Sequence, residues 1–166
     1  MRILFSGTPG FGHLLPLLPL AMAARRAGHA AALLTSGTMA AAVSPLRVLP
    51  AGPTPDVQMA EFTRRSGGAN VRVAAPAPAL AAEFFAATRV DLGADEARAA
   101  AQDYAPDVII AEVVDFIGPL VAAALAVPWA AHAFGSALPA PLIRAFDEAV
   151  VPRFAERGLT PTARLA

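Results

Sequence analysis

The sequence predicts an α/β fold in which a parallel β-sheet is covered by helices on both faces. Short apolar runs alternate with helical patterns along most of the chain. The runs expected to form strands are continuously apolar, which is typical of strands buried on both sides of a parallel sheet. The chain has 166 residues, of which 56% are hydrophobic and 16% charged, so it is long enough for one domain with a substantial core.

The first strand is predicted over Arg2–Ser6, an apolar run that ends in a glycine-rich loop. Helical spacing follows over residues 13–27, where Arg25 and Arg26 lie in the last turn and Gly28 just beyond it, a typical C-terminal signal. The remaining apolar runs predict strands over Ala30–Thr35, Arg47–Pro50, residues 107–111 and residues 127–133.

Further helices are predicted over residues 79–104, 116–126 and 142–157, with a short Ala-rich helix after Ser36 and Gly37. Residues 51–78 contain four prolines and a Gly67-Gly68 pair and show no periodicity. They therefore predict a long, mobile surface segment without regular structure.

Composition excludes several classes of function. Lys+Arg and Asp+Glu number 13 each, so the formal net charge is zero and neither a nucleic-acid nor a membrane-surface partner is expected. The absence of cysteine excludes disulfides and thiolate chemistry and fits a cytoplasmic protein. The apolar stretch 116–134 contains Pro119, Pro128 and His132 and lacks basic flanks, so it predicts a buried helix and strand, not a membrane span. The sequence contains no Asp-x-Asp motif and no His cluster, so it does not predict a metal site.

The loop after the first strand contains Gly7, Gly10 and Gly12 and leads directly into a helix. Ligands of open parallel sheets bind at the carboxyl ends of the strands, where this loop lies. Its glycines do not match the dinucleotide pattern G-x-G-x-x-G, and the chain has no lysine for a P-loop. The alternative is that the glycines only let the strand and the helix pack closely.

His13 is the candidate general base. It lies at the start of a helix directly after a strand, so it is expected to face the mouth of the sheet. A neutral imidazole in that position can accept a proton near pH 7.

Three groups of motifs resemble a known family. They are residues 1–5 with 12–21 and 27–29, residues 106–112 with 116–120 and 127–129, and residues 152–159. On these motifs the chain resembles the N-terminal, acceptor-binding domain of GT-B fold glycosyltransferases of the UDP-glycosyltransferase-like family, in its bacterial natural-product (antibiotic and macrolide) branch. The resemblance leaves residues 51–78 unmatched, and it implies a Rossmann-like sheet that forms the N-terminal half of a GT-B architecture.

The resemblance also implies an activity. An inverting, metal-independent enzyme of this family moves a sugar from a nucleotide-diphosphate sugar, its co-substrate, to a hydroxyl of a small and largely apolar natural product, with no cofactor. The base would be His13, oriented by a carboxylate after the fourth strand. That position falls on Glu112, where many relatives have Asp, so Asp115 stays open as the alternative.

The binding residues follow from the same resemblance and from the loops at the carboxyl ends of the strands. Gly10 and Gly12 would lie beside the donor phosphates. For Phe84 an ordinary place in the core is the stronger alternative. The expected acceptor-binding residues are Phe11, Phe84, Phe116, His132, Phe134 and Ser136.

Residues 1–166 are expected to form an incomplete N-terminal acceptor-binding domain, with the nucleotide-sugar-binding C-terminal domain absent from this chain. The chain alone is then expected to be inactive and to act with the missing domain, as a homodimer or as an auxiliary subunit. Two alternatives remain at this stage. One is a non-catalytic binding module or partner subunit. The other is a lipid-linked GT-B sugar transferase, whose acceptor cleft would face a membrane and need a basic or aromatic rim, which is weak in this sequence.

Overall fold

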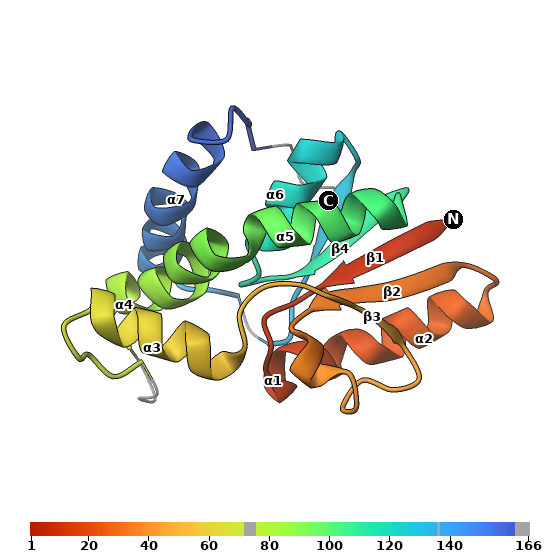
Figure 1. Cartoon of the computed structure of the whole chain (residues 1–166), viewed down its shortest axis with the longest axis horizontal. Helices are drawn as coiled ribbons and strands as arrows, with labels where there is room; N and C mark the ends of the chain where they lie inside the picture. The colour runs from red at the N-terminus through yellow and green to blue at the C-terminus, as the bar shows by residue number, and fades with distance from the viewer. Residues whose placement is uncertain (72–75, 136, 162–166) are drawn as a thin grey trace.

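A single parallel sheet forms the centre of the molecule (Figure 1). The computed structural model describes residues 1–71, 76–135 and 137–161. Within these residues the sheet has five strands in the order β3-β2-β1-β4-β5, so the strand order reverses beside β1. The predicted parallel α/β sheet is thereby confirmed. The strands are β1 (Arg2–Ser6), β2 (Ala30–Thr35), β3 (Arg47–Pro50), β4 (Val108–Glu112) and β5 (Trp129–His132).

Helices cover both faces of the sheet, as predicted. The chain leaves β1 through α1 (Phe11–Leu14), a 3-10 turn η1 (Leu15–Leu17) and α2 (Leu18–Arg26), which pack on one face. Helices α5 (Arg89–Tyr104) and α6 (Ile117–Leu125) pack on the other face (Figure 1). The remaining elements are η2 (Gly37–Met39), α3 (Pro55–Arg65), α4 (Pro78–Ala82), η3 (Glu83–Thr88) and α7 (Ala140–Ala155).

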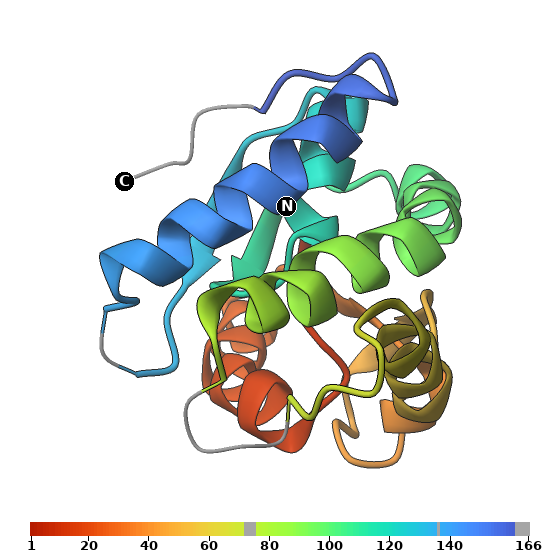
Figure 2. The ribbon, with the colours of Figure 1, turned by 90° about the vertical axis from the view of Figure 1, so that its left-hand side faces the viewer.

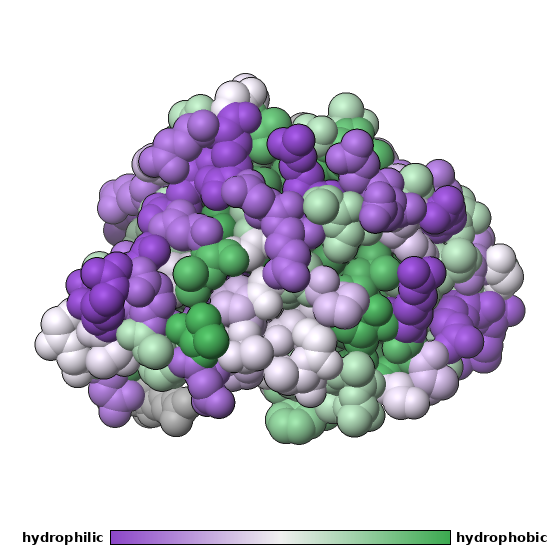
Figure 3. Space-filling view, viewed as in Figure 1, coloured by the Kyte–Doolittle hydropathy of each residue, from purple (hydrophilic) through white to green (hydrophobic). Residues whose placement is uncertain are grey.

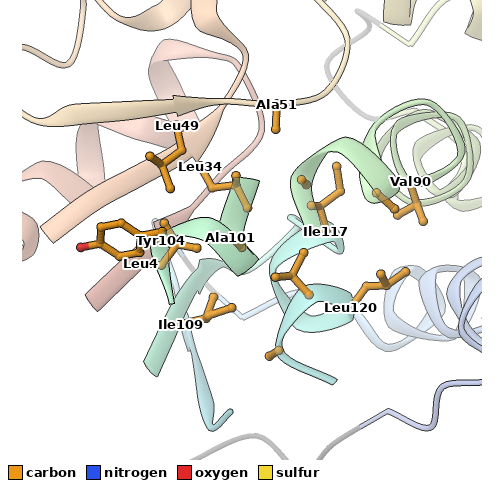
Figure 4. Packing of buried hydrophobic residues seen from close by; sticks show 14 of the residues in the cluster. Leu4, Leu34, Leu49, Ala51, Val90, Ala101, Tyr104, Ile109, Ile117 and Leu120 are labelled. Atoms are coloured by element: carbon orange, nitrogen blue, oxygen red, sulfur yellow. The ribbon is translucent and has the colours of Figure 1, made fainter. Parts of the chain in front are cut away.

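Each face of the sheet has its own apolar core, because side chains alternate along the strands. Leu4 and Ile109 point to the α5 and α6 side, where they pack with Leu120 and other buried residues (Figure 4). Phe5 points to the opposite side and packs with Leu14. The strands are buried on both sides, and this is why their sequences are continuously apolar.

Residues 51–78 contain a helix, so the prediction of a structureless segment was wrong for the described part. Thr54 accepts a hydrogen bond from the backbone N–H of Val57 at 3.4 Å, and Pro55 occupies the first turn of α3. Proline is tolerated there because the first N–H groups of a helix have no partner inside it. Phe62 anchors the helix with a fully buried side chain.

The short Ala-rich helix predicted after Ser36 and Gly37 is only a 3-10 turn, η2, followed by turns. Pro45 disfavours helical backbone at the residue before it, and Val43 and Leu46 turn into the core. The prediction of a helix here was therefore wrong.

Helices α4, η3 and α5 form one uninterrupted helical segment from Pro78 to Tyr104, which confirms the predicted helix. Its middle part, Glu83–Thr88, is π-helical, a rare form that occurs frequently at functional sites. Figure 2 shows α7 running beside this segment, where it packs against α4 and η3. In the described part of the chain, no helix is long and apolar enough to cross a membrane.

Candidate active site

The candidate site lies at the carboxyl ends of β1 and β4, beside the reversal of strand order where open sheets bind ligands. The loop after β1 passes close to the end of β4 at Gly7. A Cβ atom on Gly7 would lie 2.6 Å from Leu14 Cδ2 and 3.8 Å from Glu112 Cβ. Glycine therefore allows the first turn of the helix, which bears His13, to approach the end of β4.

His13 and Glu112 form a hydrogen-bonded pair. His13 Nδ1 lies 2.7 Å from Glu112 Oε1, and the same oxygen accepts the backbone N–H of Val114 at 3.2 Å. The side chain of Glu112 is fully buried, whereas 23% of the His13 side chain is exposed. Since Nδ1 faces the carboxylate, Nε2 is the ring nitrogen left for a substrate.

Burial raises the pKa of Glu112, and the hydrogen bond from His13 opposes this rise. The nearby charge of Asp115 raises the pKa of Glu112 further. The second oxygen, Oε2, is also buried and has no hydrogen-bond partner among the described residues.

The raised pKa of Glu112 predicts a pH dependence of stability. A carboxyl group whose pKa is higher in the folded than in the unfolded protein binds extra protons when folded, so its stabilising effect is lost as the pH rises above the ordinary value of 4.5. We expect the free energy of unfolding of the wild type to fall with pH relative to that of Glu112→Gln between about pH 4.5 and 7. Urea unfolding across this range measures the difference; parallel curves for the two proteins would contradict it.

Asp115 does not contact His13 but belongs to a buried network. Its Oδ2 accepts hydrogen bonds from Ser6 Oγ at 2.5 Å and from the Gly118 backbone at 3.0 Å, and its Oδ1 lies 3.2 Å from Arg89 Nε. Arg89, only 1% exposed, also donates through Nη2 to the carbonyl of Gly7 at 3.1 Å. The network thus joins the loops after β1 and β4 to the start of α5.

Two phenyl rings flank the imidazole of His13. The ring centroid of Phe85 lies 5.4 Å and that of Phe134 5.1 Å from the centroid of the imidazole. Phe85 comes from the π-helical segment η3 and Phe134 from the loop after β5. The two apolar rings partly shield the imidazole from water.

A cavity of about 240 Å³ opens beside His13. Its walls are mainly apolar and come from the loop after β1, from α3 and from η3. Among the predicted acceptor-binding residues, Phe84 lines it. The lining residues are Thr8, Pro9, Gly10, His13, Pro55, Gln58, Met59, Val71, Phe84 and Phe85.

Gln58, Met59 and Phe85 were missed in the sequence. Gln58 and Met59 lie on α3, which the proline-rich composition concealed. The adjacent Phe84-Phe85 pair in the sequence could have indicated that η3 contributes aromatic side chains to a binding cavity. Gln58 is 1% exposed, and its Nε2 donates to the carbonyl of Phe84 at 3.0 Å, so it connects the two helices that form the cavity wall.

Ion pairs hold α3 in place. Asp91 on α5 accepts a hydrogen bond from Arg65 Nη1 of α3 at 2.6 Å and another from Arg153 Nε of α7 at 2.8 Å. Hydrophilic side chains cover this side of the molecule, over α7 and the outer end of α3 (Figure 3). One carboxylate therefore connects the cavity wall to two other helices.

The other predicted site residues lie partly at the cavity and partly away from it. Phe11 is 63% exposed, and Phe116 packs against Phe146 with ring centroids 4.9 Å apart, so neither lines the cavity. Gly10 precedes α1 and lines the cavity, and Gly12 lies within α1. His132 ends β5 beside Glu112. Ser136 lies outside the described residues.

No group of three or more His, Asp or Glu side chains in the described ranges is placed to hold a metal ion. The polar groups that face the cavity are instead an imidazole paired with a carboxylate, a hydroxyl and an amide. This arrangement suits the removal of a proton from a ligand bound against apolar walls.

Comparison with known proteins found no matching family model. The L-demethylnoviosyl transferase of Streptomyces niveus is 32% identical over 183 aligned positions, which cover 100% of this chain and 43% of that protein. The crystal structure of SsfS6, a glycosyltransferase of Streptomyces sp. SF2575, is 31% identical with a TM-score of 0.84, over 99% of this chain and 49% of that one. SnogD, a glycosyltransferase of Streptomyces nogalater, is 29% identical with a TM-score of 0.77, over 99% of this chain and 43% of that one. The chain thus spans about half the length of these proteins or slightly less.

Proposed function

Because this chain is a homologue of Streptomyces glycosyltransferases of natural-product biosynthesis and has the fold of the N-terminal half of GT-B enzymes, we propose that it forms the acceptor-binding part of such a transferase. The observation that supports this most directly is the His13–Glu112 pair at the rim of an apolar cavity. A proton acceptor beside an apolar binding cavity is what an enzyme needs to activate the hydroxyl of a small, largely apolar acceptor.

In the proposed reaction His13 is the general base. Its Nε2 takes the proton of the acceptor hydroxyl while the hydroxyl oxygen forms a bond to the anomeric carbon of the donor. The bond from that carbon to the diphosphate oxygen breaks, and the nucleoside diphosphate leaves with the bonding electrons. A single displacement of this kind inverts the configuration at the anomeric carbon.

Glu112 supports the base in this proposal. Its Oε1 accepts the Nδ1–H of His13, which orients the ring and stabilises the imidazolium that forms as the proton moves. The longer side chain of Glu, compared with Asp, spans the distance from the end of β4 to α1. No step of this mechanism requires a metal ion.

The donor would be a nucleotide-diphosphate sugar. A structure of SsfS6 was solved in complex with thymidine diphosphate, which supports a nucleotide of this kind. We propose that Gly10 and Gly12, at the start of the helix after β1, allow the diphosphate to approach the backbone. The proposal assigns the rest of the donor site to the half of such enzymes that this chain does not match.

A chimera tests the proposed function. This chain would replace the matching half of SsfS6, and transfer from a thymidine-diphosphate sugar to hydroxylated aromatic acceptors would be followed by mass spectrometry. We expect a product with inverted anomeric configuration, in an amount that EDTA does not change. A folded chimera that binds acceptor without transferring sugar would contradict the proposal and favour a non-catalytic binding module.

The cavity gives a prediction for acceptor binding that needs no donor. Phe85→Ala removes an aromatic wall beside His13, so we expect binding of 2-naphthol to this chain to weaken about 10-fold, as loss of a buried aromatic contact of about 1.4 kcal/mol implies. Isothermal titration calorimetry measures this change. Phe11→Ala is the matched control, because Phe11 is exposed and lies outside the cavity. Equal weakening by both substitutions would place the acceptor elsewhere.

A further inference from the structure

His132 and Glu112 lie side by side at the ends of neighbouring strands. β4 and β5 are parallel, and the two residues are register partners. Register partners of parallel strands point to the same face of the sheet. For Glu112 this is the face of Ile110, which packs in the cluster of Phe5 and Leu14 below α1. His132 therefore belongs to the same face as the His13–Glu112 pair.

Both residues have a buried polar atom without a partner. Glu112 Oε2 and His132 Nδ1 are each shielded from solvent, and neither has a hydrogen-bond partner among residues 1–71, 76–135 and 137–161. Buried polar atoms in proteins nearly always bond to a protein group or to an ordered water molecule. A carboxylate oxygen accepts and an imidazole N–H donates, so the two atoms are chemically complementary.

The charges around Glu112 explain why a donor to its Oε2 matters. On the α1 side, His13 bonds only Oε1. Asp115 in the following turn raises the pKa of Glu112 by its like charge, although Arg89 is paired with Asp115. His132 is the only titratable side chain of β5. A donor to Oε2 would favour the ionised carboxylate that the Nδ1–H of His13 requires.

We propose that His132 is a positioning residue that donates its Nδ1–H to Glu112 Oε2, directly or through one water molecule. This completes a chain from His132 through Glu112 to His13. His132 does not touch the substrate in this arrangement; it keeps Glu112 ionised and oriented. The inference deepens the proposed function and rests on it, because this series of hydrogen bonds contributes to activity only where His13 acts as the base.

The test is the titration of Glu112 in this chain, followed by NMR of ¹³Cδ-labelled glutamate, with Glu112→Gln to assign its resonance. Removal of one hydrogen bond to the carboxylate in His132→Leu is expected to raise the midpoint of the Glu112 titration by about 1 pH unit. His132→Asn keeps an N–H donor near the position of Nδ1, so its midpoint should stay close to that of the wild type. His29→Leu is the matched control, because His29 precedes β2 at the opposite end of the sheet.

An unchanged midpoint in His132→Leu would overturn the inference. An equal rise in His132→Leu and His132→Asn would also overturn it, since the effect would then not depend on a donor at that position. The titration requires no sugar transfer. A raised midpoint together with an inactive wild-type chimera would therefore reject the proposed function and leave the contact between His132 and Glu112 established.

Discussion

Replacement of His13 by alanine is expected to lower sugar transfer by the SsfS6 chimera about 10²- to 10⁴-fold, the usual contribution of a general base. In the proposed reaction, Nε2 of His13 takes the proton of a hydroxyl bound in the cavity, while Nδ1 is engaged by Glu112. Without the imidazole, the attacking oxygen would have to lose its proton to water. Steady-state measurement of kcat/KM with a fixed donor concentration determines the loss.

Acceptor binding separates this catalytic effect from a structural one. The cavity walls remain when the imidazole is removed, so 2-naphthol should bind to His13→Ala within about 3-fold of the wild type, because most of the apolar contact area is retained. Phe11→Ala serves again as the control for a substitution outside the cavity. Transfer at the wild-type rate by His13→Ala would remove this residue from the mechanism.

The second large effect is expected on stability. Arg89→Met leaves the fully buried carboxylate of Asp115 without its cation and removes a hydrogen bond to the carbonyl of Gly7. Breaking a buried ion pair by removing one partner typically costs about 3–5 kcal/mol in the free energy of unfolding. Urea denaturation followed by circular dichroism measures the loss.

Two further variants test the origin of this loss. Arg64→Met changes an arginine whose side chain is 71% exposed, and it should leave the denaturation midpoint almost unchanged. In the double variant Arg89→Met with Asp115→Asn the buried charge is gone as well, so part of the stability should return. A double variant as unstable as the sum of its two single variants would show that charge pairing is not the cause.

The sequence was sufficient to predict the sheet because its strands are buried on both faces and contain few polar residues. The sequence also predicted that His13 lies near the carboxyl edge of the sheet, because it belongs to the helix that follows the first strand, and the structure places it there beside Glu112. Its role as a base stays a prediction. The choice between Glu112 and Asp115 could not be made, because Glu112 ends β4, Asp115 lies three residues later, and only the direction of each side chain separates them. In the structure Glu112 faces α1, whereas Asp115 faces Arg89.

Arg89 shows the other limit of sequence-based prediction. Arginine is rarely buried, and the spacing of residues 79–104 gives no sign that one arginine would point inward to a carboxylate 26 positions away. Helix α3 was missed for a different reason: its prolines were interpreted as breaks, although Pro55 occupies the first turn of the helix, where proline is favoured.

The π-helical segment Glu83–Thr88 has a consequence for how the binding cavity can diversify. A π turn contains one residue more than an α turn, so deletion of a single codon there would restore regular α-helix while the flanking helices α4 and α5 keep their places. The deletion would change which side chains of this segment face the cavity beside Phe84 and Phe85, whereas the sheet, His13 and Glu112 would keep their places. Under the proposed function, the gain or loss of this one residue would alter the acceptor cavity without moving the His13–Glu112 pair.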